Sequence, residues 1–177
     1  MVQAEQQIDT NLYSRQIGTF GLETMGKLIK MKVLIIGMRG LGVEIAKNLI
    51  LAGPKSVTIY DPTQVSVADM GANFYISEAD VGNKTRAEAS VTQLKELNPH
   101  VDVQVTNEFN NDMVNQFNVI CITENFWNSD RLIEINELCR QNRVGYILTE
   151  NLGLASYAFL DYGAEFLVND KDGEQTK

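Results

Sequence analysis

Four consecutive apolar residues at 33–36 begin the clearest pattern in the chain. Such an unbroken run is typical of a parallel strand that is buried on both faces of a sheet. Glycines follow, and apolar residues then recur every three or four positions over 41–52, which predicts a helix that ends at Gly53. A second strand is predicted over 57–60, directly before Asp61. The pattern therefore predicts one strand–helix–strand unit of about thirty residues.

The rest of the chain continues this alternation of strands and helices. Further strands are predicted at 101–105, 118–123 and 144–149, and further helices at 84–97 and 130–141, with at best a short helix at 110–116. We therefore expect an α/β fold with a Rossmann-like, doubly wound, mostly parallel sheet. Two short antiparallel strands, 155–161 and 165–168, are predicted at the C-terminal end, joined by a tight turn at Tyr162-Gly163.

Helical spacing also precedes the first strand. Asp9 is a candidate N-cap for a helix that reaches Phe20, and 22–29 shows a second helical pattern, with Gly18 and Gly21 allowing a break between them. This helical prelude is unusual for a plain NAD-binding domain, which commonly starts with its first strand.

These patterns also suggest the division of the chain. We expect a flexible N-terminus over 1–8, one domain over 9–168, and a linker over 169–177 that leads into a further domain outside this chain. The loop over 62–80 is long for a compact domain, and such loops are usually functional or cover something.

Composition narrows the possible partners. The 177 residues carry a net charge of −8, which argues against nucleic acid as a partner, because phosphates need a basic surface. No apolar run approaches the roughly twenty residues of a membrane span, so we expect no membrane partner. An intracellular protein, cytoplasmic and nuclear, is the resulting expectation.

The residue types that most often carry nucleophilic or metal chemistry are scarce. Cys121 lies in a predicted strand and Cys139 in a predicted helix, without the C-x-x-C spacing of a zinc or redox site. His100 is the single histidine and falls in a helix-to-strand turn. A histidine-based triad or a metal cluster is therefore hard to build, and no metal site is predicted.

Gly37, Gly40 and Gly42 form a variant of the G-x-G-x-x-G pattern, with one residue added after the first glycine. Glycines here allow a sharp turn into a helix whose first N–H groups can receive a phosphate. The same glycines also suit close strand–helix packing without a ligand. Asp61, 19 residues beyond Gly42, has the spacing of a ribose-binding acid, so an NAD-dependent oxidoreductase is one alternative.

A more specific resemblance runs along nearly the whole chain. The segments that carry it are Leu12-Tyr13-Ser14-Arg15-Gln16-Ile17, Gly21, 33–42, 43–48, Leu51-Ala52-Gly53, Gly82, Arg86-Ala87-Glu88, Leu97-Asn98 and Gly173-Glu174. This ordered set resembles the ubiquitin-activating enzymes, and within them the N-terminal, inactive adenylation half. The small subunit of the SUMO-activating enzyme is a close relative and an alternative within the family. Family members use ATP to adenylate the C-terminus of ubiquitin and then pass it to a cysteine thiol.

The resemblance also implies what this half lacks. Active halves carry a ribose aspartate, matched here by Asp61, and then a segment S-N-L-N-R-Q-F, whose arginine is replaced by Ala72 and whose first asparagine is replaced by Asp69. Active halves also carry an aspartate for magnesium within a segment T-N-A-L-D-N, and the matching stretch 123–128 has no aspartate in register. We therefore expect Gly37, Gly40, Gly42 and Asp61 to form a degenerate nucleotide cradle, with no cofactor bound by this half and Mg–ATP held by the paired active half.

Two arginines remain to be assigned. The resemblance implies that Arg15 crosses to the ATP held by the other half, a role in trans that its planar charge suits; a surface ion pair is the alternative. Arg39 lies inside the glycine loop, where it fills the phosphate space, points into solvent, or pairs with an acid across the interface, and the sequence does not choose among these. The expected partners are thus an active adenylation half and ubiquitin or a related modifier.

Overall fold

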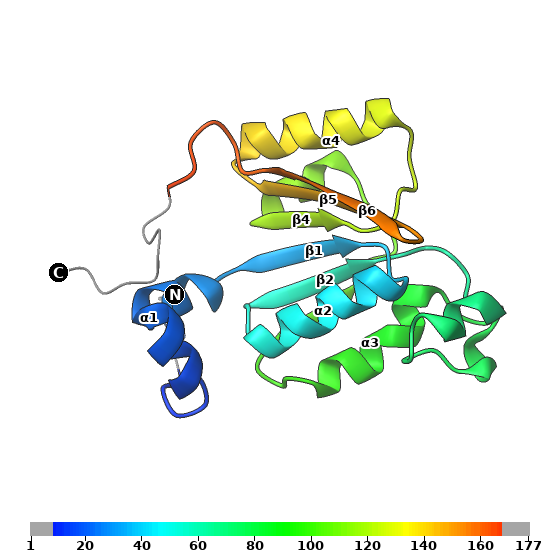
Figure 1. Cartoon of the computed structure of the whole chain (residues 1–177), viewed down its shortest axis with the longest axis horizontal. Coiled ribbons are helices and arrows are strands. Elements are labelled where there is room, and N and C mark those ends of the chain that lie inside the picture. The colour runs from blue at the N-terminus through cyan, green and yellow to red at the C-terminus, as the bar shows by residue number, and fades with distance from the viewer. Residues whose placement is uncertain (1–8, 168–177) are drawn as a thin grey trace.

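A six-stranded sheet with helices on both faces forms the part of the chain that the structure, a computed structural model, describes, which is residues 9–167 (Figure 1). The strands are β1 (Lys32–Ile36), β2 (Ser56–Tyr60), β3 (Asp102–Val105), β4 (Val119–Ile122), β5 (Gly145–Leu152) and β6 (Ala155–Asp161). Their order across the sheet is β3-β2-β1-β4-β5-β6. The first five are parallel and β6 is antiparallel to β5. The predicted Rossmann-like, mostly parallel fold is confirmed.

The helices follow the strands in the predicted order. They are α1 (Ser14–Leu28), α2 (Gly40–Ala52), α3 (Arg86–Glu96) and α4 (Ser129–Asn142), with short 3-10 helices η1 (Val67–Gly71), η2 (Glu78–Asp80) and η3 (Asn111–Gln116). Local signals set their ends. Thr85 and Glu88 form a capping box at the start of α3, and Gly53 ends α2 with a φ of 89° that favours glycine.

Two apolar cores lie on opposite faces of the sheet, because successive side chains of a strand point to opposite sides. Val33 and Ile35 of β1 pack with α2 and α3, whereas Leu34 and Ile36 pack with α4 and η3. Figure 1 shows the same layering, with α4 on one side of the sheet and α2 with α3 on the other. The four-residue apolar run was therefore correctly interpreted as a strand buried on both faces.

The helical prelude is present and broken where glycine permits. Gly21 takes non-helical angles (φ 79°, ψ 159°) inside α1, so two helical segments meet there at a kink. Tyr13, just before α1, packs its ring against Gly53 at the C-terminal end of α2. The prelude is thereby fixed to the βαβ unit beside the beginning of β1.

The C-terminal antiparallel pairing is present, but one predicted strand is wrong. β6 pairs with β5 across a turn at Gly153-Leu154, while residues 165–167 form no strand. The ring of Tyr162 lies against Gly145 and stacks on Phe166 at 4.9 Å, which takes this segment away from the sheet edge. The expectations for 1–8, for 169–177 and for Val168 lie outside the described residues.

Candidate functional site

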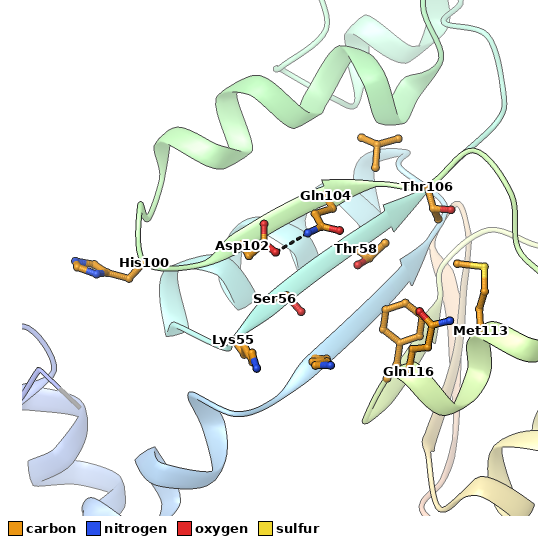
Figure 2. Close-up of a pocket in the computed structure, with 12 residues that line it drawn as sticks. Lys55, Ser56, Thr58, His100, Asp102, Gln104, Thr106, Met113 and Gln116 are labelled. Atoms are coloured by element: carbon orange, nitrogen blue, oxygen red, sulfur yellow. Dashed lines mark hydrogen bonds between the residues drawn. The ribbon is translucent and has the colours of Figure 1, made fainter. Parts of the chain in front are cut away.

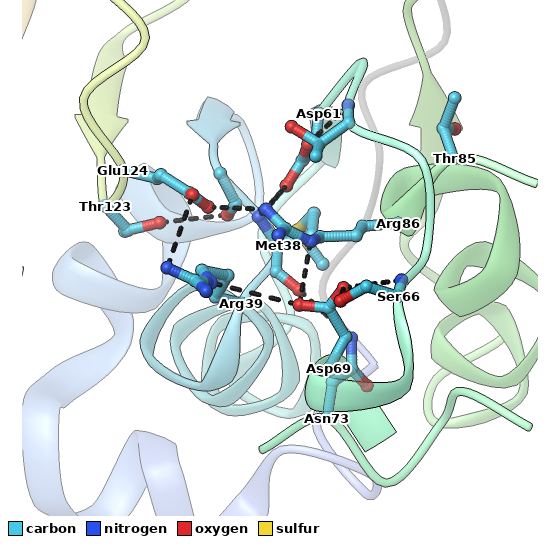
Figure 3. A network of polar contacts seen from close by, with 12 residues as sticks. Met38, Arg39, Asp61, Ser66, Asp69, Asn73, Thr85, Arg86, Thr123 and Glu124 are labelled. Atoms are coloured by element: carbon cyan, nitrogen blue, oxygen red, sulfur yellow. Dashed lines mark hydrogen bonds and ion pairs between the residues drawn. The ribbon is translucent and has the colours of Figure 1, made fainter. Parts of the chain in front are cut away.

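Three loops meet at the carboxyl ends of β1, β2 and β4 (Figure 3). β1 leads into α2 on one face of the sheet and β4 leads into α4 on the other, so the chain diverges between these two neighbouring strands. Open α/β sheets bind ligands at such a point, outside the carboxyl ends of the strands. The topology therefore places the candidate site over the glycine loop.

Close packing accounts for two of the three glycines. A Cβ built on Gly42 would lie 1.9 Å from the Gly37 carbonyl oxygen, and one built on Gly37, where φ is 100°, would lie 2.7 Å from the Cβ of Glu124. The Thr123 hydroxyl closes the turn by donating to the carbonyl oxygens of Gly37 (2.9 Å) and Ile36 (3.1 Å). These glycines are thus required by the strand–helix junction itself, and they leave the start of α2 open.

The N-terminus of α2 keeps free backbone donors. The N–H of Val43 donates to the carbonyl oxygen of Arg39 at 2.9 Å, which closes the first turn of the helix. The N–H groups of 40, 41 and 42 precede that bond and face the loop, where an anion would be favoured by them and by the helix dipole.

Asp61 is buried beneath the glycine loop. One carboxylate oxygen accepts the Met38 N–H at 2.8 Å and the other accepts the Thr63 N–H at 2.9 Å. In this structure the predicted ribose-binding acid therefore braces the loop from below, tying the end of β2 to the turn after β1.

A buried arginine joins two of the three loops. The Nη1 of Arg86 lies 2.9 Å from Glu124 Oε2 and 3.6 Å from Asp61 Oδ2, and its Nε lies 3.0 Å from Asp69 Oδ1. Burial disfavours the charged form, but these carboxylates outweigh burial and raise the pKa of Arg86. Arg86 thus holds together residues that follow β2 and β4.

Arg39 completes a ring of alternating charges. Its Nε lies 3.8 Å from Asp69 Oδ1 and its Nη1 lies 3.7 Å from Glu124 Oε1. Asp69, Arg86, Glu124 and Arg39 are called the charged ring from here on. The sequence left three positions open for Arg39, namely the phosphate space, solvent, or an acid across the interface. The structure instead pairs it with two acids of its own chain, over the glycine loop (Figure 3).

The carboxylates of the ring titrate differently because their surroundings differ. Burial raises the pKa of Glu124, and Arg86 offsets only part of that effect. Burial also acts on Asp69, but hydrogen bonds from the Ser66 hydroxyl and N–H, together with Arg86, hold the pKa of Asp69 below its ordinary value. Arginine side chains contact the carboxylates of both Asp69 and Glu124, so the negative charges are compensated by cations of the same chain.

The long loop after β2 covers the glycine loop. Asn73 is fully buried and donates to the Met38 carbonyl oxygen at 3.1 Å and to the Ser90 hydroxyl at 2.9 Å. A Cβ built on Gly40 would lie only 3.2 Å from the Cβ of Ala72. The expectation that this loop covers something is thus met at the glycine loop.

A cleft of about 460 Å³ opens over this arrangement. Its lining residues, which come from the glycine loop, the covering loop and the ends of β4 and β5, are Arg39, Gly40, Leu41, Ala72, Thr123, Glu124, Asn125, Glu150 and Asn151. One of these side chains is cationic and two are carboxylates. The cleft thus lies over the glycine loop and is poor in positive charge.

Arg15 lies elsewhere. Its exposed side chain is on α1, whose start packs at the C-terminal end of α2 through Tyr13, whereas the glycine loop is at the opposite end of that helix. The 13 residues of α2 separate the two by roughly 20 Å. The structure therefore brings Gly37, Gly40, Gly42 and Asp61 together and keeps Arg15 apart from them.

The sequence pattern gave Arg86 no role. In the structure, the capping box of Thr85 and Glu88 sets the start of α3, and Arg86 follows the cap directly. Nothing in the spacing indicates that its side chain turns inward, because this depends on where β4 places Glu124.

Other candidate positions are inert or lie outside the cleft. Burial raises the pKa of Cys121 to about 11 and that of Cys139 to about 12, as expected of core thiols. Phe126 and Trp127 pack against the core between the sheet and α4. Within residues 9–167, no group of three or more His, Cys, Asp or Glu side chains is placed to hold a metal ion, and no helix is long and apolar enough to cross a membrane.

A second hollow lies on the sheet face beside η3 and contains none of the predicted site residues (Figure 2). It measures about 580 Å³ and is lined mainly by polar side chains of β2 and β3, among them Ser56, Thr58, Asp102 and Gln104. Lys55 and His100 lie toward one end of it, and both are exposed. This groove is an open polar surface of the sheet.

Comparison with known proteins places the chain in a family. The model of the ThiF family matches residues 13–160. The chain belongs to the ThiF family. It is 40% identical over 168 residues to ubiquitin-activating enzyme E1 1 of Schizosaccharomyces pombe and 43% identical over 173 residues to that of Arabidopsis thaliana. It is also 40% identical over 173 residues to human ubiquitin-like modifier-activating enzyme 1. The resemblance to ubiquitin-activating enzymes is confirmed.

The matches cover much of this chain and little of the relatives. They span 95%, 96% and 97% of the chain, respectively, but 16% of each relative. Among solved structures, two of Escherichia coli MccB share the fold, with TM-scores of 0.72 and 0.73 at 19% identity. They cover 90% and 88% of this ThiF-family chain and 49% and 50% of the MccB chains.

Proposed function

We propose that this ThiF-family chain is the non-catalytic adenylation half of an enzyme that activates ubiquitin or a related modifier. The observation that carries the proposal is the 40% to 43% identity to ubiquitin-activating enzymes along nearly the whole chain. The family membership favours adenylation over the NAD-dependent alternative. The small subunit of a SUMO-activating enzyme remains the alternative within the family.

The residues over the glycine loop support a non-catalytic role. Mg–ATP needs cationic groups at its phosphates and a free carboxylate for the metal. Here Ala72 brings no charge, Asp69 is a carboxylate, and Glu124 already contacts both arginines of the charged ring. These residues do not fit Mg–ATP, so we assign no chemical step to this cleft.

An apolar surface supports pairing with an active half. A hollow of about 620 Å³ lies beside α2, lined by Val33, Ile45, Val119, Ile147 and Phe166 among others. Parallel sheets are usually covered on both faces, and exposed apolar patches commonly mark interfaces. Phe20 and Leu22 of α1 are also 60% and 57% exposed. We assign these surfaces to the second adenylation half, since the relatives are about six times as long as their match to this chain.

Arg15 is the residue proposed to reach the chemistry. It is exposed on α1, far from the cradle of its own chain, which suits a contact made with the other half. A guanidinium forms charge-assisted hydrogen bonds with phosphate oxygens, and such bonds are worth about 1.5–3 kcal/mol. Arg15 would therefore contact the ATP that the active half holds.

The test uses the complete enzyme that contains this half. Arg15→Ala is expected to lower kcat/KM for ATP in ATP–pyrophosphate exchange by about 10- to 100-fold. Arg15→Lys is expected to recover part of the loss, since it keeps the charge and loses the planar fork. Lys27→Ala, on the same helix, is the matched control and is expected to leave exchange unchanged. Wild-type exchange in Arg15→Ala would refute the role in trans.

A further inference from the structure

The charged ring has an inner and an outer cation that share the same two carboxylates. Arg86 is 5% exposed and makes the short contacts, 3.0 Å to Asp69 and 2.9 Å to Glu124. The side chain of Arg39 is 58% exposed and makes the long ones, 3.8 Å to Asp69 and 3.7 Å to Glu124. The inner cation is thus fixed by its surroundings, while the outer one lies between the two acids at the surface.

The ring stands where a phosphate would have to enter. Arg39 is the N-cap residue of α2, and it lines the cleft together with Gly40, Leu41 and Glu124. A phosphate approaching the free N–H groups of 40, 41 and 42 would pass Arg39 and Glu124, which line the cleft, while the buried Asp69 contacts Arg39 at 3.8 Å. Figure 3 shows Arg39 between Glu124 and Asp69 at this position.

The charges around the loop are unfavourable for a polyanion. Arg39 and Arg86 face three carboxylates, those of Asp61, Asp69 and Glu124, so the group carries a net charge of −1. A triphosphate that contacts Arg39 would compete with both of its carboxylates for the guanidinium. Those carboxylates would then face the phosphates, and like charges close together repel strongly in a partly buried site.

We propose that the charged ring fills the phosphate position of the glycine loop from within the chain, and that it thereby excludes nucleotides. Asp69 and Glu124 are the residues that exclude nucleotides, because they pair with two guanidinium groups that would otherwise attract phosphate. The inference deepens the non-catalytic role in the proposed function and rests on that part of it. It does not depend on Arg15 or on pairing, since it concerns the cleft of this chain alone.

The test neutralises the two acids and asks whether phosphate then binds. Tripolyphosphate and Mg–ATP are titrated calorimetrically into the 177-residue chain, its double variant Asp69→Asn/Glu124→Gln, and a control. Glu96→Gln/Glu137→Gln changes the net charge equally at two exposed helix positions and is the matched control. The wild type and the control are expected to give no binding heat. The double variant is expected to bind tripolyphosphate at least about tenfold more tightly than either.

The location of binding is read from backbone amide resonances. In the double variant, the signals of 40, 41 and 42 are expected to shift with added tripolyphosphate. Two results would overturn the proposal: wild-type binding that shifts these same amides, or a folded double variant that stays silent. If circular dichroism shows that the double variant is unfolded, Glu124→Gln alone is used, with the same expected direction, because Asp69 then still pairs with Arg86. Neither titration reports on exchange activity, so this inference and the proposed role of Arg15 fail independently.

Discussion

Replacing Arg86 with methionine tests the charge network at its most buried point. The variant keeps the length and much of the apolar volume of the side chain but removes the guanidinium. Three carboxylates, on Asp61, Asp69 and Glu124, then lose their nearest cation. Their remaining partners are unequal. Asp61 and Asp69 accept backbone N–H bonds, and Arg39 remains 3.8 Å from Asp69 and 3.7 Å from Glu124.

The expected loss follows from burial. Removing one partner of a buried ion pair typically costs about 3–5 kcal/mol, because the other charge remains buried and uncompensated. The free energy of unfolding of a domain is about 5–15 kcal/mol, so Arg86→Met should remove a large fraction of it. For a chain of this size the melting temperature should fall by roughly 6–20 °C.

Urea unfolding followed by circular dichroism provides the assay, with Arg131→Met as control. Arg131 also lies in the first turn of a helix, but its side chain is 25% exposed and pairs with a half-exposed Glu134, so about 0–1 kcal/mol is expected. A loss in Arg86→Met no larger than that of the control would refute the reasoning.

The pH dependence of the loss provides a second check. Burial already raises the pKa of Glu124, and loss of Arg86 raises it further, so the folded variant binds a proton at Glu124 more tightly than the unfolded chain does. Protonation therefore stabilises the folded variant more as pH falls. Because of this, the loss in free energy of unfolding relative to wild type should be smaller at pH 5 than at pH 8. A deficit independent of pH would mean that lost packing, and not unpaired charge, is responsible.

Two further predictions concern the glycine loop and the C-terminal strand. Gly42→Ala should lower the free energy of unfolding, measured in urea, by about 3 kcal/mol or more, because its Cβ would lie 1.9 Å from the Gly37 carbonyl oxygen. Gly71→Ala is the control: its Cβ would have nothing within 4 Å, so the change should be less than about 0.5 kcal/mol. Equal losses in the two variants would contradict the packing argument. Arg140, the Gly163 N–H and Asn136 lower the pKa of Asp161 to about 2, so its stabilisation is present above about pH 4 and is lost as pH falls toward 2. Asp161→Asn should flatten the fall of stability with pH in that window, and an unchanged slope measured by thermal unfolding would contradict the assignment.

Much of the fold was predictable because its signals are local. The apolar run at 33–36, the helical spacing over 41–52 and the glycines between them each record a requirement that neighbouring residues satisfy on their own. The same holds for the capping box of α3 and for the break at Gly21. The predicted strand at 165–168 was wrong over its described residues. Tyr162 lies against Gly145, which is distant in sequence, and stacks on Phe166, and these contacts direct the chain away from the sheet edge.

The candidate site was predictable in part. Gly37, Gly40, Gly42 and Asp61 were identified from spacing, and the structure brings them together, whereas their predicted role as a degenerate nucleotide cradle stays a prediction. The position of Arg15 in trans also stays a prediction, although its separation from the cleft is now defined.

The sequence by itself determined the order of elements, the two-sided burial of the sheet and the place of the glycine loop. These follow from hydrophobic periodicity and from backbone preferences that act within a few residues. Only the tertiary structure decided which charges meet, because Arg39, Asp69, Arg86 and Glu124 come from four separate segments that converge when parallel strands align their carboxyl ends. Electrostatic pairing depends on distance in space and on burial, and neither is written in the spacing of residues along the chain.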